Sequence, residues 1–138
     1  MGVAFYIRIE NCPEDLDVSV DGKNLGLAID SLNTFAQGEL LKPLGDFLSH
    51  DPSELLEILS EGDREILEER GIKSVLPPEQ WFAPADGLKT IRRLIQWIDT
   101  MPSQIKKPGE VLHDLKRFEA ILSEAEQRGL RWHLAMDI

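Results

Sequence analysis

The sequence predicts an α+β fold with two layers, in which a small sheet of about three strands is covered on one face by helices. Three features indicate this class: alternating segments at both ends of the chain, another alternating segment at 15–21, and helical periodicity in most of the rest. Residues 3–10 and 131–138 carry large apolar side chains at alternate positions, as strands with one buried face do. A terminal strand needs a partner, so we expect these two strands to pair and to close a single domain over residues 1–138.

Residues 15–21 are the third predicted strand, and a turn at Cys12-Pro13 should join it to the first in an antiparallel hairpin. Leucine and valine alternate there with polar side chains, most of them aspartates. The D-x-S-x-D-G spacing that begins at Asp17 also matches the first half of an EF-hand calcium loop. However, Ala28 stands where that loop requires a bidentate carboxylate. We therefore expect a strand and no metal site.

Helical periodicity is clearest in three segments of the chain. The first should begin at Asn24, whose side chain can cap a helix, and end at Gly38. The other two span 87–101 and 108–128, each with one wide apolar face, and are joined by a short linker. A capping box that begins at Asp51 predicts a further helix. These helices should provide the layer that covers the sheet.

Composition excludes several classes of function. The chain has 25 acidic and 15 basic residues, for a net charge of −10, which argues against binding to nucleic acid. The stretch Asp46–Asp86 has a net charge of −8, whereas Leu88–Lys107 has a net charge of +4. There is no apolar run long enough to span a membrane, and the lone Cys12 fits a reducing compartment. We expect a soluble, cytoplasmic protein.

The polar face of the predicted sheet is one candidate binding surface. If all three strands share a sheet, the face turned away from the core gathers acidic and basic side chains, among them Tyr6, Arg8, Asp17, Arg131 and His133. Pairing of charges across a solvated sheet is the simpler interpretation. The alternative is that this face binds a polar ligand or a partner.

The aromatic pair Trp81-Phe82 is the other candidate binding site, since it lies in a proline-rich connection. Two adjacent aromatic side chains in a loop can anchor a partner protein. They can also fold back over the helices as a lid, which would avoid exposing a large apolar area. The second interpretation is favoured on that ground.

No catalytic residue or cofactor is predicted. Cys12 lies between acidic residues, which would raise the pKa of a thiol and make it less nucleophilic. None of the three histidines, His50, His113 and His133, is spaced from another as paired metal ligands are. The sequence also lacks a glycine-rich phosphate loop and a dinucleotide fingerprint.

The function expected from these observations is a non-catalytic protein–protein interaction module, either an adaptor or an immunity-like protein. Its acidic surface between Asp46 and Asp86 would bind a basic partner protein. Homodimerisation through the sheet edge or the aromatic pair is compatible with this function. The alternative is a small ligand-binding protein or enzyme that uses the polar sheet face around Arg8 and His133.

Overall fold

A computed structural model describes residues 4–50 and 78–137 of the chain. The chain divides into two compact units, Met1–Leu48 with Trp81–Ile138, and Ser49–Gln80. The predicted helix at Asp51 lies outside the described residues. The expectation of one domain over residues 1–138 stays a prediction.

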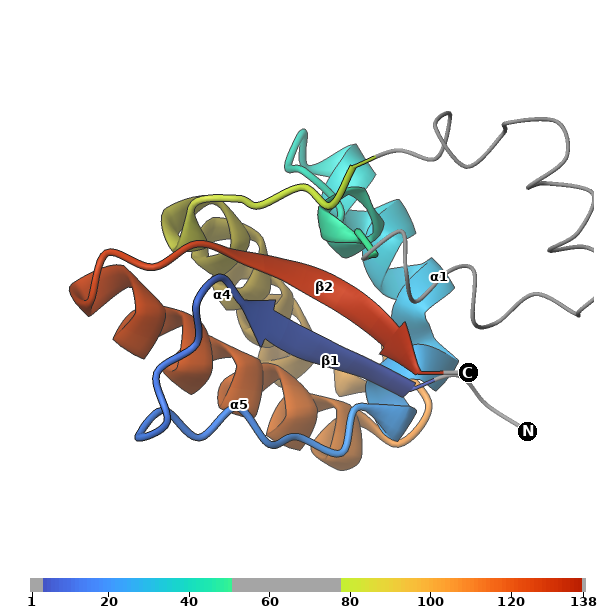
Figure 1. Ribbon diagram of the computed structural model, residues 1–138. Coiled ribbons are helices and arrows are strands. Elements are labelled where there is room, and N and C mark those ends of the chain that lie inside the picture. The colour runs from blue at the N-terminus through green and yellow to red at the C-terminus, as the bar shows by residue number, and fades with distance from the viewer. Residues whose placement is uncertain (1–3, 51–77, 138) are drawn as a thin grey trace, which may run out of the picture. The chain divides into compact units, whose positions relative to one another are not determined.

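In its described residues the first unit contains three α-helices, two strands and two short 3-10 helices (Figure 1). Its fold class is α+β. They are β1 (Ala4–Ile9), α1 (Lys23–Gly38), η1 (Leu44–Phe47), α4 (Pro84–Thr100), η3 (Pro102–Gln104), α5 (Pro108–Gln127) and β2 (Trp132–Asp137).

The two terminal strands form an antiparallel sheet, as the sequence predicts. Their register runs from Ala4 opposite Asp137 to Ile9 opposite Trp132. Figure 1 shows the two strands side by side, with the helices behind them. Alternation places Phe5, Ile7 and Ile9 in the core, because successive side chains of a strand point to opposite faces.

The predicted third strand at 15–21 is not formed, so the expected hairpin with β1 is wrong. This segment is irregular, and the side chain of Arg117 on α5 binds its backbone. The guanidinium Nε donates to the carbonyl oxygen of Ser19 and Nη2 donates to that of Asp17, each at 2.8 Å. To form a strand here, these two carbonyl groups would have to accept hydrogen bonds from a neighbouring strand. They are already bonded to a side chain of α5.

A close approach at Gly22 joins this segment to β1. The amide of Phe5 donates to the carbonyl oxygen of Gly22 at 3.2 Å. Gly22 has φ of +71°, and a Cβ atom there would lie 1.8 Å from the carbonyl oxygen of Phe5. Only glycine fits, because it tolerates positive φ and has no side chain to collide with the strand.

The other edge of β2 carries two isolated bridges instead of a strand. Phe82 pairs with Trp132 through two backbone hydrogen bonds, with N···O distances of 2.7 and 3.0 Å. Leu48 forms a parallel bridge with Leu134. Because β1 occupies one edge of β2, these bridges occupy the opposite edge.

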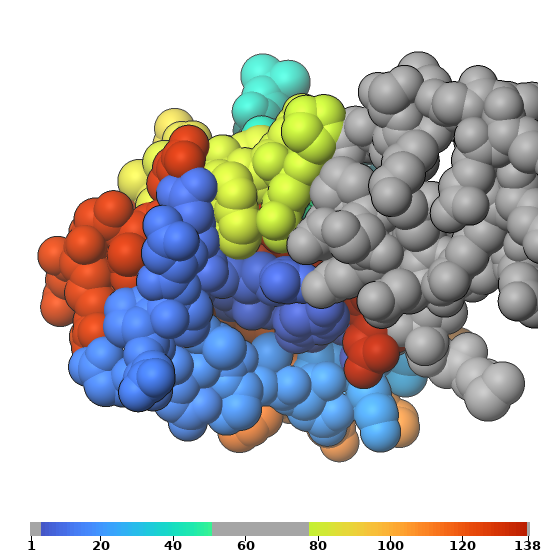
Figure 2. All heavy atoms as spheres, viewed as in Figure 1, coloured from blue at the N-terminus to red at the C-terminus, as the bar shows by residue number. Residues whose placement is uncertain are grey.

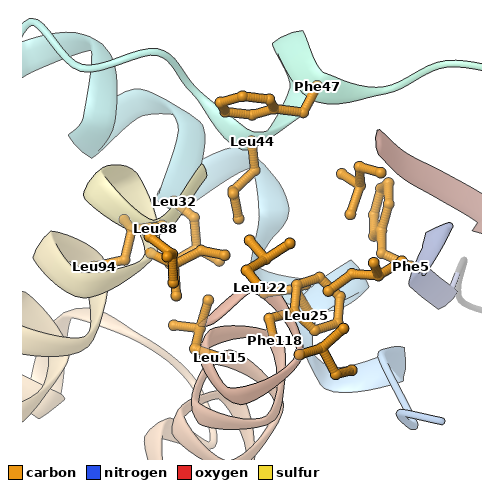
Figure 3. Close-up of a cluster of buried hydrophobic side chains, with 14 of the residues drawn as sticks. Phe5, Leu25, Leu32, Leu44, Phe47, Leu88, Leu94, Leu115, Phe118 and Leu122 are labelled. Carbon is orange, nitrogen blue, oxygen red and sulfur yellow. The ribbon is translucent and has the colours of Figure 1, made fainter. Parts of the chain in front are cut away.

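The core lies between the sheet, η1 and the three α-helices (Figure 3). The predicted apolar faces of the two long helices are confirmed, since their central side chains are fully buried. From α4 and α5 these are Leu88, Ile91, Leu94, Ile98, Leu115, Phe118, Ile121 and Leu122. Figure 3 shows Leu44 and Phe47 of η1 and Phe5 of β1 turned toward the same cluster.

Helix α1 is capped by a residue from another helix. The predicted cap, Asn24, lies inside the first turn, and Gly22 is at the N-cap position without a side chain. The buried carboxylate of Asp114 on α5 accepts a hydrogen bond from the backbone N–H of Leu25 at 3.1 Å. The prediction for Asn24 is therefore wrong, because the acceptor for this donor comes from residue 114.

Candidate functional site

The polar face of the sheet is only partly a solvated surface. The register places Tyr6 opposite Ala135 and Arg8 opposite His133. Tyr6 and Arg8 are half-buried, whereas His133 is fully buried. The expectation that His133 stands on an open face is therefore wrong.

The cover over His133 is the indole of Trp81. The two ring centroids are 4.7 Å apart, and the planes are tilted by 49°. His133 Nδ1 lies 2.9 Å from the carbonyl oxygen of Leu134, and since a carbonyl can only accept, Nδ1 carries the proton in this contact. In Figure 2 the yellow-green segment 81–83 lies next to the dark blue atoms of β1. Sequence alternation identifies the face of a strand, but not what covers that face.

Phe82 folds back onto the core beside Trp81. Its ring meets that of Phe47 edge to face, with centroids 5.3 Å apart, and Lys42 Nζ lies 4.1 Å from the Phe82 centroid. The indole N–H of Trp132 donates to the carbonyl oxygen of Ala83 at 3.3 Å. The aromatic pair is therefore folded back, as predicted, but onto β2 and η1 instead of over the long helices, and both Trp81 and Phe82 remain half-buried.

Arg131 pairs with Glu10 of the same predicted polar face, whereas Asp17 does not join that face. Arg131 forms a two-pronged ion pair with Glu10, in which Nε and Nη2 lie 2.8 and 2.6 Å from the carboxylate oxygens. Asp17 lies in the irregular segment beside α5, where it accepts hydrogen bonds from the N–H and hydroxyl of Ser19. Because the third strand is absent, Asp17 is not on the sheet face with Arg8 and His133, and that part of the prediction is wrong.

Two aspartates in this irregular segment have lowered pKa values. The pKa of Asp15 falls below its usual 3.8 because Arg128 donates hydrogen bonds to the carboxylate and attracts its charge. The pKa of Asp17 is also lowered, chiefly by the hydrogen bonds from Ser19. Both carboxylates are exposed, so they serve as charged anchors of the segment at neutral pH.

A hollow of about 450 Å³ lies between α1 and the connection from α4 to α5. Its lining is partly apolar and partly basic, and consists of Asn24, Leu27, Ala28, Ser31, Gln104, Ile105, Lys106 and Lys107. Sequence analysis missed this site, because its two halves are about 80 positions apart in the chain. The available signals were Leu27, which lies off the apolar stripe of α1, and the adjacent lysines Lys106-Lys107.

Within residues 4–50 and 78–137, no three histidine, cysteine or acidic side chains come together in a way that could hold a metal ion. The ring of the buried His133 packs against the indole of Trp81. None of the described helices is both long and apolar enough to cross a membrane.

Comparison with known proteins identifies no matching family model, no similar curated protein and no similar solved structure. Over residues 4–50 and 78–137 the fold is α+β, with three α-helices and a two-stranded antiparallel sheet made of the first and last strands.

Proposed function

We propose that this protein is a non-catalytic protein–protein interaction module that uses the acidic segment Ser49–Gln80 to bind a basic partner protein. The observation that carries the proposal is the concentration of acidic residues in this one segment of the chain. In the described part of the chain, arginines bind carboxylates of the same unit. The pairs are Arg92–Glu119, Arg93–Glu39, Arg117–Asp17, Arg128–Asp15, Arg128–Glu124 and Arg131–Glu10.

The segment Ser49–Gln80 has a different composition. It contains nine acidic and three basic residues, so it carries −6 of the net charge of −10 in 32 of 138 residues. Even if each basic residue neutralised one carboxylate, six would have no basic counterpart within the segment. An excess of one sign attracts a partner of opposite charge and accelerates its association.

The attachment of this segment supports the same proposal. The chain enters it directly after Leu48, which bridges to Leu134, and leaves it just before Phe82, which pairs with Trp132. Within the segment, the backbone N–H of Gln80 donates to the hydroxyl of Ser49 at 2.7 Å. The two ends of the acidic segment are therefore hydrogen-bonded to each other. Leu48 and Phe82, which lie on either side of the segment in the chain, both bridge to β2.

The test compares the natural chain with two variants of equal net charge. In the first variant Glu65, Glu68 and Glu69 become glutamine. In the control, three exposed carboxylates of the other unit are neutralised, with the changes Glu14→Gln, Asp99→Asn and Glu126→Gln. Each protein is used to capture partners from native lysate, and the captured proteins are quantified by mass spectrometry.

We expect a basic protein to bind the natural chain and the control but not the segment variant. It should be released at about 0.5 M salt, where screening acts over only a few ångströms. Capture of the same proteins by all three chains, or the absence of a basic protein among them, would contradict the proposal.

A further inference from the structure

The hollow between α1 and the α4–α5 connection has the properties of a peptide-binding site. Its volume of about 450 Å³ lies in the range of pockets that hold a ligand or an anchoring side chain. Leu27 is 69% exposed, although it is a large apolar residue, while Ala28 and Ile105 beside it are almost fully buried. An apolar group placed in the hollow would therefore remove Leu27 from water and gain free energy.

The rim of the hollow is positively charged, and no acidic side chain of its lining neutralises this charge. Lys106 and Lys107 line it, and no carboxylate does. Neither lysine forms an ion pair with any carboxylate in the described part of the chain, in contrast to Arg128, which pairs with two. In a protein of net charge −10, two neighbouring cations left unpaired beside an apolar floor are complementary to an anionic, partly apolar ligand.

A second hollow continues the first along α1. It has a volume of about 390 Å³, and Ser31 and Gln104 line both hollows. Its wall includes the stacked rings of Phe35 and Trp97, whose centroids are 4.1 Å apart. From Asn24 to Phe35 the helix rises about 16 Å, which matches roughly five residues of extended chain and exceeds the length of a single side chain.

We propose that these two hollows bind an acidic peptide segment of a partner protein. A carboxylate of the peptide contacts Lys106 and Lys107, and an adjacent apolar side chain covers Leu27. Because Asp30 lines the second hollow, the other end of the bound peptide is apolar or aromatic and lies against Trp97. This site is independent of the acidic segment Ser49–Gln80 and selects a ligand of the opposite charge.

The test selects peptides from a random library of 12-residue sequences on the full-length chain. Enriched peptides are then titrated against the natural chain and two double variants. Lys106→Glu with Lys107→Glu reverses the charge of the rim. Lys89→Glu with Lys116→Glu makes the same change in net charge at exposed lysines of α4 and α5.

We expect enriched peptides to carry Asp or Glu near a large apolar residue. Reversal of the rim should weaken their binding at least tenfold, whereas the control should change it less than twofold. If the rim variant fails to fold by circular dichroism, Lys106→Gln with Lys107→Gln replaces it and should weaken binding at least threefold. A shift of the Trp97 indole resonance on binding would locate the peptide at this site.

Three outcomes would overturn the proposal. They are a selection that enriches nothing, enriched peptides without acidic residues, and equal weakening by the rim variant and the control. Retention of the basic partner by the Glu65, Glu68 and Glu69 variant would contradict only the proposed function. The two proposals can therefore fail separately.

Discussion

The carboxylate of Asp114 should stabilise the first turn of α1, although it is 89 positions away from its hydrogen-bond donor. The perturbation is Asp114→Ala. Leu25 is fully buried, so its backbone N–H would lose its acceptor at a place that water does not reach. A buried donor without a partner costs about 1 to 3 kcal/mol.

Measurements on helix caps give an independent scale for this change. Removal of an N-cap side chain costs about 0.5 to 2 kcal/mol. A negative charge near the helix N-terminus adds about 0.3 to 1 kcal/mol. We therefore expect Asp114→Ala to lower the free energy of unfolding by about 2 kcal/mol.

Urea unfolding followed by far-UV circular dichroism measures this difference. With a slope of about 2 kcal/mol/M, the midpoint should fall by about 1 M. Asn24→Ala is the matched control, because Asn24 is the cap that the sequence predicts but forms no cap hydrogen bond. It should move the midpoint by less than about 0.25 M, as surface substitutions usually do.

Hydrogen exchange at the Leu25 amide gives a local measure of the same interaction. Asp114→Ala should accelerate that exchange more than exchange at the centre of α5, while Asp114→Asn, which keeps an oxygen acceptor, should lie in between. The reasoning is refuted if Asn24→Ala destabilises the protein as much as Asp114→Ala, or if the Leu25 amide stays protected in the alanine variant.

Three further predictions concern the remaining parts of the fold. Gly22→Ala should abolish cooperative unfolding or lower the urea midpoint by more than Asp114→Ala, because the new Cβ would collide with the Phe5 carbonyl oxygen at 1.8 Å; a near-natural midpoint would contradict this. The lowered pKa of Asp15 means that its contribution to stability is present above the usual value of 3.8 and is lost as pH falls through the folded-state pKa. In Arg128→Gln, NMR titration should return the Asp15 pKa toward 3.8, and an unchanged titration would exclude the ion pair as its cause. Replacement of residues 51–77 by a six-residue glycine-serine linker should leave a cooperatively folding protein, because the other unit is compact by itself, and should remove binding of the basic partner. Loss of native near-UV circular dichroism would refute this.

Elements defined by local chemistry could be predicted from the sequence. The helices predicted at 87–101 and 108–128 are found at 84–100 and 108–127, because apolar residues at helical spacing act within a few residues of chain. The first of them begins at Pro84, three residues earlier than predicted. The pairing of the terminal strands also follows, because each presents one continuous apolar face and needs a partner.

The candidate sites could be predicted only in part. The positions Tyr6, Arg8 and His133 were placed on one face of the sheet by alternation, and the register confirms that grouping. The burial of His133 under Trp81 was missed, because it depends on the path of a connection some 50 residues earlier in the chain. The peptide-sized hollow was missed for the same reason, since it joins α1 to the Lys106 region.

The sequence by itself determined the α+β class, the terminal strands, the long helices and the uneven distribution of charge, because periodicity and composition are local properties of the chain. Tertiary structure alone decided that residues 15–21 bind Arg117 instead of a strand, and that Asp114 caps α1. In both cases a backbone group has several possible partners. Alternation shows which face of a segment is apolar, but packing in three dimensions selects the side chain that completes its hydrogen bonds.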